Sequence, residues 1–119
     1  MKYNLSLFLS FLLFNISVIS QEDIQTDLVR TNQGDLSIYF IGHGSLMFKY
    51  NNQTIYVDPS KASGKDFKKL PKADLVLITH SHGDHLDFQV LNQIETNKTK
   101  YLSNELSYEQ LQKGNSIKN

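Results

Sequence analysis

Cysteine is absent from this chain of 119 residues, and so is any net charge, because 12 Lys and Arg residues balance 12 Asp and Glu residues. Without cysteine there can be no disulfide scaffold, no thiolate zinc site and no cysteine nucleophile. A bound metal must therefore be held by nitrogen and oxygen atoms. Without an overall positive charge the chain has no long-range field that attracts nucleic acid, so we expect no nucleic-acid partner.

An unbroken apolar run of about 20 residues, the length needed to span a bilayer, is also missing. The most apolar stretch, residues 5–18, is shorter, contains Asn15 and follows Lys2. Small residues near Ser20 provide a signal peptidase site. We therefore expect residues 1–20 to be a cleaved signal peptide, which makes the protein exported (periplasmic or secreted) with no stable membrane anchor. The alternative is a transmembrane anchor.

The remaining chain divides into a polar lead-in of uncertain order, residues 21–33, and one domain, residues 34–119. Runs rich in β-branched, aromatic and aliphatic residues predict four strands, at residues 35–41, 45–50, 53–57 and 75–79. Gly-rich and Asn-rich turns separate the first three, which predicts a meander. The fourth is apolar nearly throughout, which is typical of a strand covered on both faces.

Helical spacing of apolar residues predicts a helix from Asp87 to Glu95. A second helix is expected over Glu105–Lys113, with Asn104 as its cap, Gly114 as its stop, and Leu106 and Leu111 on its inner side. Residues 99–103 are a candidate short strand. Residues 61–72 are expected to form a loop with one short helical turn near residues 66–70.

Residues 80–85 read His-Ser-His-Gly-Asp-His and hold three of the four histidines in the chain. Side chains two positions apart on an extended chain point the same way, so His80 and His82 can face one ion. Gly83 allows a tight turn that brings Asp84 and His85 to the same cavity. So many ligand groups within six residues favour a metal site over histidines that merely lie on the surface or fill the core.

Imidazole and carboxylate ligands suit zinc, manganese or iron. We expect zinc, as one or two ions, with manganese and iron as alternatives. A catalytic site of this kind keeps a position open for water, and the ion lowers the pKa of that water towards neutrality.

Residues 79–85, Thr-His-Ser-His-Gly-Asp-His, resemble the His-x-His-x-Asp-His signature of the metallo-β-lactamase superfamily of metal-dependent hydrolases. Members of that family begin with a meander of strands, carry an Asp at the end of an early strand and place the signature after a following apolar strand. Asp58 and residues 75–79 occupy those places. The segments Ile41-Gly-His-Gly-Ser45 and Val57-Asp-Pro59 are most similar to the lactonase-like and phosphodiesterase-like branches.

The resemblance implies an α/β fold, and it covers only the N-terminal half of a metallo-β-lactamase-type αβ/βα sandwich. We therefore expect a truncated domain with an open hydrophobic face. The family completes its metal sites with a further histidine, a bridging carboxylate and a last histidine from later in the chain, and here no histidine follows His85. The expected sites cannot be closed by this chain alone.

The same resemblance implies that His80 and His82 belong to a first metal site, and that Asp84 and His85 belong to a second. Asp84 is also the implied catalytic group, orienting the attacking hydroxide. The implied reaction is attack by a metal-bound hydroxide on an ester, lactone, amide or phosphodiester bond of a small-molecule substrate. The alternative from another class is a non-catalytic exported metal-binding module or an inactive truncated fragment.

Two further residues have open roles. His43 lies in the Gly-rich turn and is either a solvent-exposed turn residue or a group that contacts substrate or a metal ligand. Asp58 is either a strand-end carboxylate that binds nearby backbone N–H groups or, as the resemblance implies, a residue beside the metals that organises the histidine loop. Neither is expected to be a metal ligand.

Overall fold

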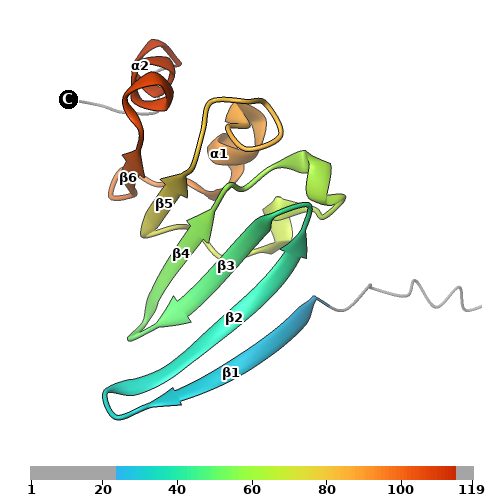
Figure 1. The fold of residues 1–119 in the computed structure, drawn as a ribbon, viewed down its shortest axis with the longest axis vertical. Helices are drawn as coiled ribbons and strands as arrows, with labels where there is room; N and C mark the ends of the chain where they lie inside the picture. Colours follow the sequence, from blue (N-terminus) through green and yellow to red (C-terminus); the bar gives the residue numbers. More distant parts are fainter. Residues whose placement is uncertain (1–23, 115–119) are drawn as a thin grey trace, which may run out of the picture.

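The computed structural model describes residues 24–114, so the predicted signal peptide, residues 1–20, lies outside the described residues. Six strands form one mixed sheet in the order β1-β2-β3-β4-β5-β6 (Figure 1). The strands are β1 Gln25–Thr31, β2 Gly34–Gly42, β3 Ser45–Tyr50, β4 Gln53–Val57, β5 Leu75–Ile78 and β6 Lys100–Ser103. Two 3₁₀ turns and two helices complete the fold: η1 Lys61–Ser63, η2 Phe67–Lys69, α1 Phe88–Ile94 and α2 Glu105–Lys113.

The first four strands pair antiparallel in sequence, which confirms the predicted meander. Strand β1 was not predicted. It pairs with β2 over its whole length, from Gln25 opposite Phe40 to Thr31 opposite Gly34. All seven of its residues are exposed, so its side chains carry no alternating apolar pattern and its stability comes from backbone pairing with β2.

Both predicted helices are confirmed, and each begins at a capping side chain. The carboxylate of Asp87 accepts hydrogen bonds from the backbone N–H groups of Gln89 and Val90 at the start of α1. The side chain of Asn104 accepts one from the backbone N–H of Ser107 at the start of α2. These bonds satisfy N–H groups that have no partner within the helix. Within residues 24–114, neither helix is long and apolar enough to cross a membrane.

The prediction that Leu106 faces inward is wrong, because its side chain is 57% exposed. Leu106 and Leu111 are five positions apart, and on a helix of about 3.6 residues per turn that spacing places them on different faces. Ser107, four positions before Leu111, shares its inner face, and both residues are fully buried.

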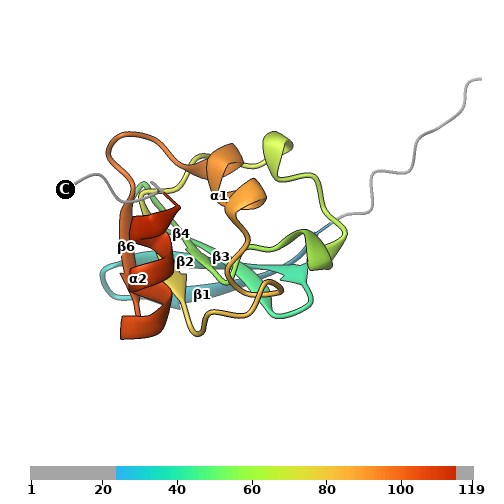
Figure 2. The same cartoon turned by 90° about the horizontal axis from the view of Figure 1, so that it is seen from above.

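One face of the sheet carries the hydrophobic core. Met47, Tyr56 and Val76 lie opposite one another on neighbouring strands and are at most 2% exposed. They pack in one cluster with residues of α1 and with Leu111 of α2. Figure 2 shows α1 on one side of the strands. We call this side the covered face.

The opposite side, which we call the open face, carries two rows of apolar side chains that pair across the strands. The rows are Ile38, Phe48, Ile55 and Leu75, and Phe40, Leu46, Val57, Leu77 and Leu102. None of these side chains is buried. The open hydrophobic face expected from the sequence is therefore present. The prediction that β5 is covered on both faces is wrong, because Val76 and Ile78 are buried whereas Leu75 and Leu77, on the open face, are only half-buried.

The strand directions bring the candidate site residues to one edge of the sheet. β4 and β5 are parallel, and two antiparallel steps give β2 the same direction. The segments that follow these strands are the turn at residues 42–44, Asp58 and the loop of residues 80–85. In an open sheet of this kind, ligands bind at the edge formed by the carboxyl ends of the strands.

Candidate metal centre

The loop after β5 brings together the side chains expected to bind metal. Ligand atoms of His80, His82 and Asp84 all lie within 4.8 Å of one another. The ring of His85 lies 3.7 Å from that of His80, centroid to centroid, and its Nε2 is 3.5 Å from Asp84 Oδ2. Three imidazoles and a carboxylate, with no thiolate, fit zinc, manganese or iron. The division of these ligands between two ions stays a prediction.

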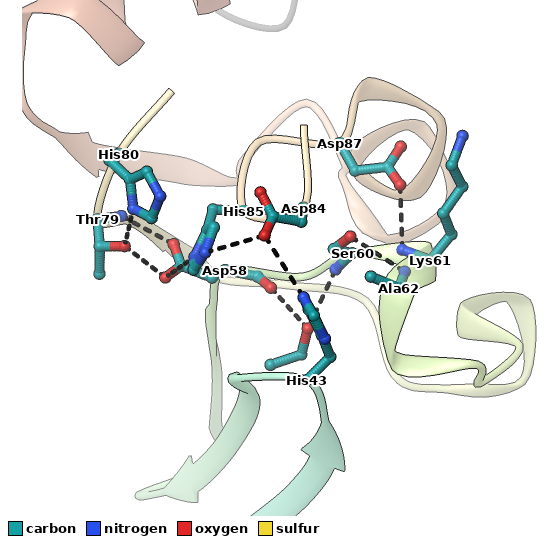
Figure 3. A network of polar contacts seen from close by, with 11 residues as sticks. His43, Asp58, Ser60, Lys61, Ala62, Thr79, His80, Asp84, His85 and Asp87 are labelled. Carbon is teal, nitrogen blue, oxygen red and sulfur yellow. Dashed lines mark hydrogen bonds and ion pairs between the residues drawn. The ribbon is translucent and has the colours of Figure 1, made fainter. Parts of the chain in front are cut away.

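Asp58 holds the inner side of this loop (Figure 3). The residue follows β4, is 4% exposed and has a positive φ of 45°. One carboxylate oxygen accepts the backbone N–H of Thr79 at 2.8 Å, and the other lies 2.9 Å from His85 Nδ1. The contact expected between Asp58 and the histidine loop is therefore present.

Thr79 links the same carboxylate to a second histidine. Its hydroxyl donates to Asp58 Oδ2, which can only accept, and it lies 3.0 Å from His80 Nδ1. Because Thr79 donates its only hydroxyl proton to Asp58, its oxygen can only accept from His80. The Nδ1 atom of His80 therefore carries a hydrogen and donates it in a hydrogen bond to Thr79 Oγ1. By the same reasoning His85 Nδ1 donates to Asp58. Both rings then keep Nε2 as the free acceptor atom, which is the nitrogen available to a metal ion.

Asp84 and His43 form the outer side. His43 Nε2 lies 3.4 Å from Asp84 Oδ2, and the two side chains are 52% and 48% exposed. A hydrogen bond from its own backbone amide, and then the hydrogen bond from His43, lower the pKa of the Asp84 carboxyl below its usual value. Asp84 is therefore ionised at neutral pH, the state that can bind a cation.

The turn that carries His43 has an unusual backbone. His43 has a φ of 48°, between Gly42 at 121° and Gly44 at 77°. A Cβ atom at Gly42 would lie 3.2 Å from the carbonyl oxygen of Ser63, so the turn and η1 are in close contact there. A histidine in the left-handed region is uncommon and marks a position worth testing for function. The structure places His43 beside the candidate ligand Asp84, with its side chain 52% exposed, so both of its predicted roles stay open.

Three supporting residues were not predicted from the sequence. The sequence predicts only that Thr79 ends a strand. Its position directly before the first histidine of the loop is the signal that indicates a contact with that loop. Ser45 is buried, donates to the carbonyl oxygen of Asp58 at 2.6 Å and accepts from the backbone N–H of Ser60. Asp87 was placed only near a helix start, yet its second oxygen also accepts the backbone N–H of Lys61 at 3.0 Å. The Ser45 bonds join β3 to the segment that follows β4, and the Asp87 bond joins the first residue of η1 to the cap of α1.

An α/β domain with a mixed sheet and a histidine loop at the carboxyl end of β5 has the architecture of a metal-dependent hydrolase. A family model described as the beta-lactamase superfamily domain matches residues 37–118, more than half of the chain. The chain belongs to this family. The predicted family and fold class are therefore confirmed.

Two curated relatives are named UPF0173 metal-dependent hydrolases. A UPF0173 metal-dependent hydrolase of Thermodesulfovibrio yellowstonii is 37% identical over a stretch that covers 44% of this chain and 22% of the relative. One from Flavobacterium johnsoniae is 41% identical, over 43% of this chain and 24% of the relative. The matched stretches therefore span about a quarter of the length of these relatives.

A solved structure agrees in fold. The crystal structure of a proposed metal-dependent hydrolase from Parabacteroides distasonis superposes with a TM-score of 0.72 and 44% sequence identity. The match covers 76% of this chain and 41% of the solved chain. More than half of the solved chain thus has no counterpart in the match.

Proposed function

We propose that the loop of residues 80–85 binds a divalent metal ion, with zinc as the ion, and serves metal-dependent hydrolysis of a small-molecule ester, lactone, amide or phosphodiester. The observation that supports this proposal is the mutual approach of ligand atoms from His80, His82 and Asp84 within 4.8 Å. A bound ion would supply Lewis acidity at the bond to be cleaved and would make water nucleophilic near neutral pH.

The residues of this chain have separate tasks in such a reaction. Asp58 and Thr79 hold the rings of His85 and His80 with Nε2 free, so neither ring has to reorient when an ion binds. The exposed Oδ2 of Asp84 is placed to accept a hydrogen bond from the attacking water and so to orient it. His43, at the rim of the site, is placed to contact substrate or to keep Asp84 in position.

A second candidate function is a metal-binding module without catalysis. The observation that favours it is that, among residues 24–114, only the three ligand groups of His80, His82 and Asp84 lie within 4.8 Å of one another. In that case the ligands hold an ion but no complete reactive site forms around it. The two functions predict the same metal binding and differ only in turnover.

Hydrolysis assays on the full chain separate the two candidates. We would measure release of p-nitrophenol from an acetate ester and from bis-p-nitrophenyl phosphate, and opening of a lactone, each with added zinc, manganese or iron. Turnover that is lost in the His80→Ala/His82→Ala variant would establish a hydrolase. Metal binding with no turnover on any substrate would establish the non-catalytic module.

We also propose that the protein acts after export, on the basis of the apolar segment in residues 1–20 and the small residues near Ser20. The test is to recover the protein from the medium, the periplasm and the cytoplasm of an expressing cell, and to determine its N-terminal sequence in each fraction. A chain that begins at Gln21 supports export. A chain that retains Met1 and remains inside the cell contradicts it.

A further inference from the structure

Asp58 adopts a backbone conformation that its local sequence disfavours. Its φ of 45° lies in the left-handed region, which residues other than glycine rarely occupy. Asp58 also precedes Pro59, and the residue before a proline prefers an extended conformation with a negative φ. A conformation that is unfavourable for two separate reasons persists only where the surrounding structure imposes it. The residues that impose it here are therefore candidates for a role in the site.

Two hydrogen bonds fix the peptide planes on either side of Asp58. Its backbone N–H donates to the carbonyl oxygen of Leu77 on β5 at 3.0 Å, which fixes the plane before it. Its carbonyl oxygen accepts the hydroxyl hydrogen of Ser45 at 2.6 Å, which fixes the plane after it. Because each peptide unit is planar, holding both planes sets φ and ψ of the residue between them. A neighbouring strand supplies the first bond, whereas a single side chain supplies the second.

Ser45 closes the turn of residues 58–60 from the inside. It is the first residue of β3, is 1% exposed, and its oxygen also accepts the backbone N–H of Ser60 at 3.2 Å. A serine hydroxyl has one hydrogen, and here that hydrogen is donated to Asp58. Pro59 and Ser60 are fully buried, so no solvent water reaches the turn to replace the hydroxyl.

The direction of the Asp58 carboxylate follows from this backbone conformation. The two peptide planes determine where Cβ lies, and the carboxylate then meets the backbone N–H of Thr79 at 2.8 Å and Nδ1 of His85 at 2.9 Å (Figure 3). If φ relaxed to a negative value, Cβ would move and these bonds would lengthen. His85 would then lose the acceptor that keeps its hydrogen on Nδ1 and leaves Nε2 free.

We propose that Ser45 is a positioning residue for the candidate metal centre. Its hydroxyl holds Asp58 in the left-handed conformation and, through the Asp58 carboxylate, keeps His85 with Nε2 free for an ion. The hydroxyl itself bonds only to backbone groups, so Ser45 acts through Asp58. Its role at an ion rests on the proposed function, whereas its control of the His85 tautomer exists in the metal-free chain and can be tested there.

Ser107 provides a matched control for Ser45. Both serines are buried, at 0% and 1% exposed, but Ser107 Oγ has no hydrogen-bond partner among residues 24–114. Ser45→Ala and Ser107→Ala therefore remove the same atom from buried positions, and only Ser45→Ala removes hydrogen bonds. Circular dichroism of the full chain shows whether each variant is folded.

The first measurement is nuclear magnetic resonance of the imidazole nitrogens in the metal-free chain, at about pH 8, where free imidazole is neutral. The parent and Ser107→Ala should show His85 as one tautomer, with its hydrogen on Nδ1. Ser45→Ala should show a second population with the hydrogen on Nε2, because a displaced carboxylate no longer accepts from Nδ1. If Ser45→Ala does not fold, Ser45→Cys takes its place in this measurement, since a thiol fills the position of the hydroxyl but donates more weakly.

The second measurement is calorimetric titration of the full chain with zinc. Ser45→Ala should bind zinc about three- to tenfold more weakly than the parent, because removing a group behind a metal ligand weakens the site without removing the ligand. Ser107→Ala should bind zinc as the parent does.

Two results would overturn the proposal. One is a folded Ser45→Ala or Ser45→Cys variant in which His85 keeps the single tautomer of the parent. The other is an equal loss of zinc affinity in Ser45→Ala and Ser107→Ala, which would show that the site responds to any change in the core. A parent that binds no metal, while Ser45→Ala shows the second tautomer, would contradict the proposed function and still support the control of His85 by Ser45.

Discussion

The two sides of the histidine loop are held in different ways. On the inner side, the side chain of Asp58 is 5% exposed and lies 2.9 Å from His85 Nδ1. On the outer side, Asp84 and His43 are about half exposed and approach only to 3.4 Å. Short hydrogen bonds to a buried carboxylate hold the candidate ligands His80 and His85 on the inner side, whereas the long contact between the exposed side chains of His43 and Asp84 leaves Asp84 freer to move. Substitutions on the two sides should therefore have unequal effects.

The largest effect is expected for Asp58→Ala. This substitution leaves the backbone N–H and hydroxyl of Thr79 and the Nδ1–H of His85 without their acceptor. We expect the free energy of unfolding to fall by about 2–4 kcal/mol and zinc affinity to fall about 10- to 100-fold. Thermal unfolding and calorimetric titration with zinc measure the two quantities.

The matched control is Asp58→Asn, which keeps one oxygen acceptor and tolerates the positive φ at this position. It should lose less stability than Asp58→Ala. Equal stability of the parent and Asp58→Ala would show that the inner side is not held through this carboxylate.

An intermediate effect is expected for Thr79→Val. The valine side chain has nearly the same shape but lacks the hydroxyl that joins His80 Nδ1 to Asp58. We expect a loss of about 1 kcal/mol in unfolding free energy and a zinc affinity about tenfold lower. Thr79→Ser, which keeps the hydroxyl, is the control and should bind zinc as the parent does. If both variants bind equally well, the hydroxyl does not orient His80.

The smallest effect is expected on the outer side, from His43→Gly. Glycine adopts the φ of 48° at this position without strain, and the lost contact to Asp84 is long and exposed. We expect the unfolding free energy to rise by about 0.5–1 kcal/mol and zinc affinity to change less than about threefold. His43→Ala, which keeps the strain but removes the ring, separates the two contributions. A loss of zinc affinity as large as that of Asp58→Ala would remove the distinction between the two sides.

The sequence predicted the elements that carry strong local signals. Strands β3 and β4 and helix α2 begin and end at the predicted residues. The turn residues Asn51 and Asn52 separate the two strands, and the caps Asn104 and Gly114 mark the two ends of the helix. The histidine loop was predicted because three histidines and an aspartate lie within six residues. These features depend on neighbours in sequence.

The features that the sequence did not predict depend on neighbours in space. Strand β1 has exposed side chains on both faces and forms only because β2 offers a partner. The bond from Thr79 to Asp58 joins residues 21 positions apart, and nothing at either position specifies the distance between them. The prediction that Leu106 faces inward rests on its apolar side chain alone. Its spacing of five residues from the buried Leu111 places it on another face of the helix.

Zinc titration of the full chain shows whether residues 80–85 form a metal site. Calorimetry should show at least one zinc ion bound per chain in the parent and a loss of affinity of at least about 100-fold in the His80→Ala/His82→Ala variant, with both proteins folded. We expect binding to be lost in the variant alone. A folded parent that binds no zinc, manganese or iron, or a variant that binds zinc as tightly as the parent, would exclude a metal site formed by His80 and His82.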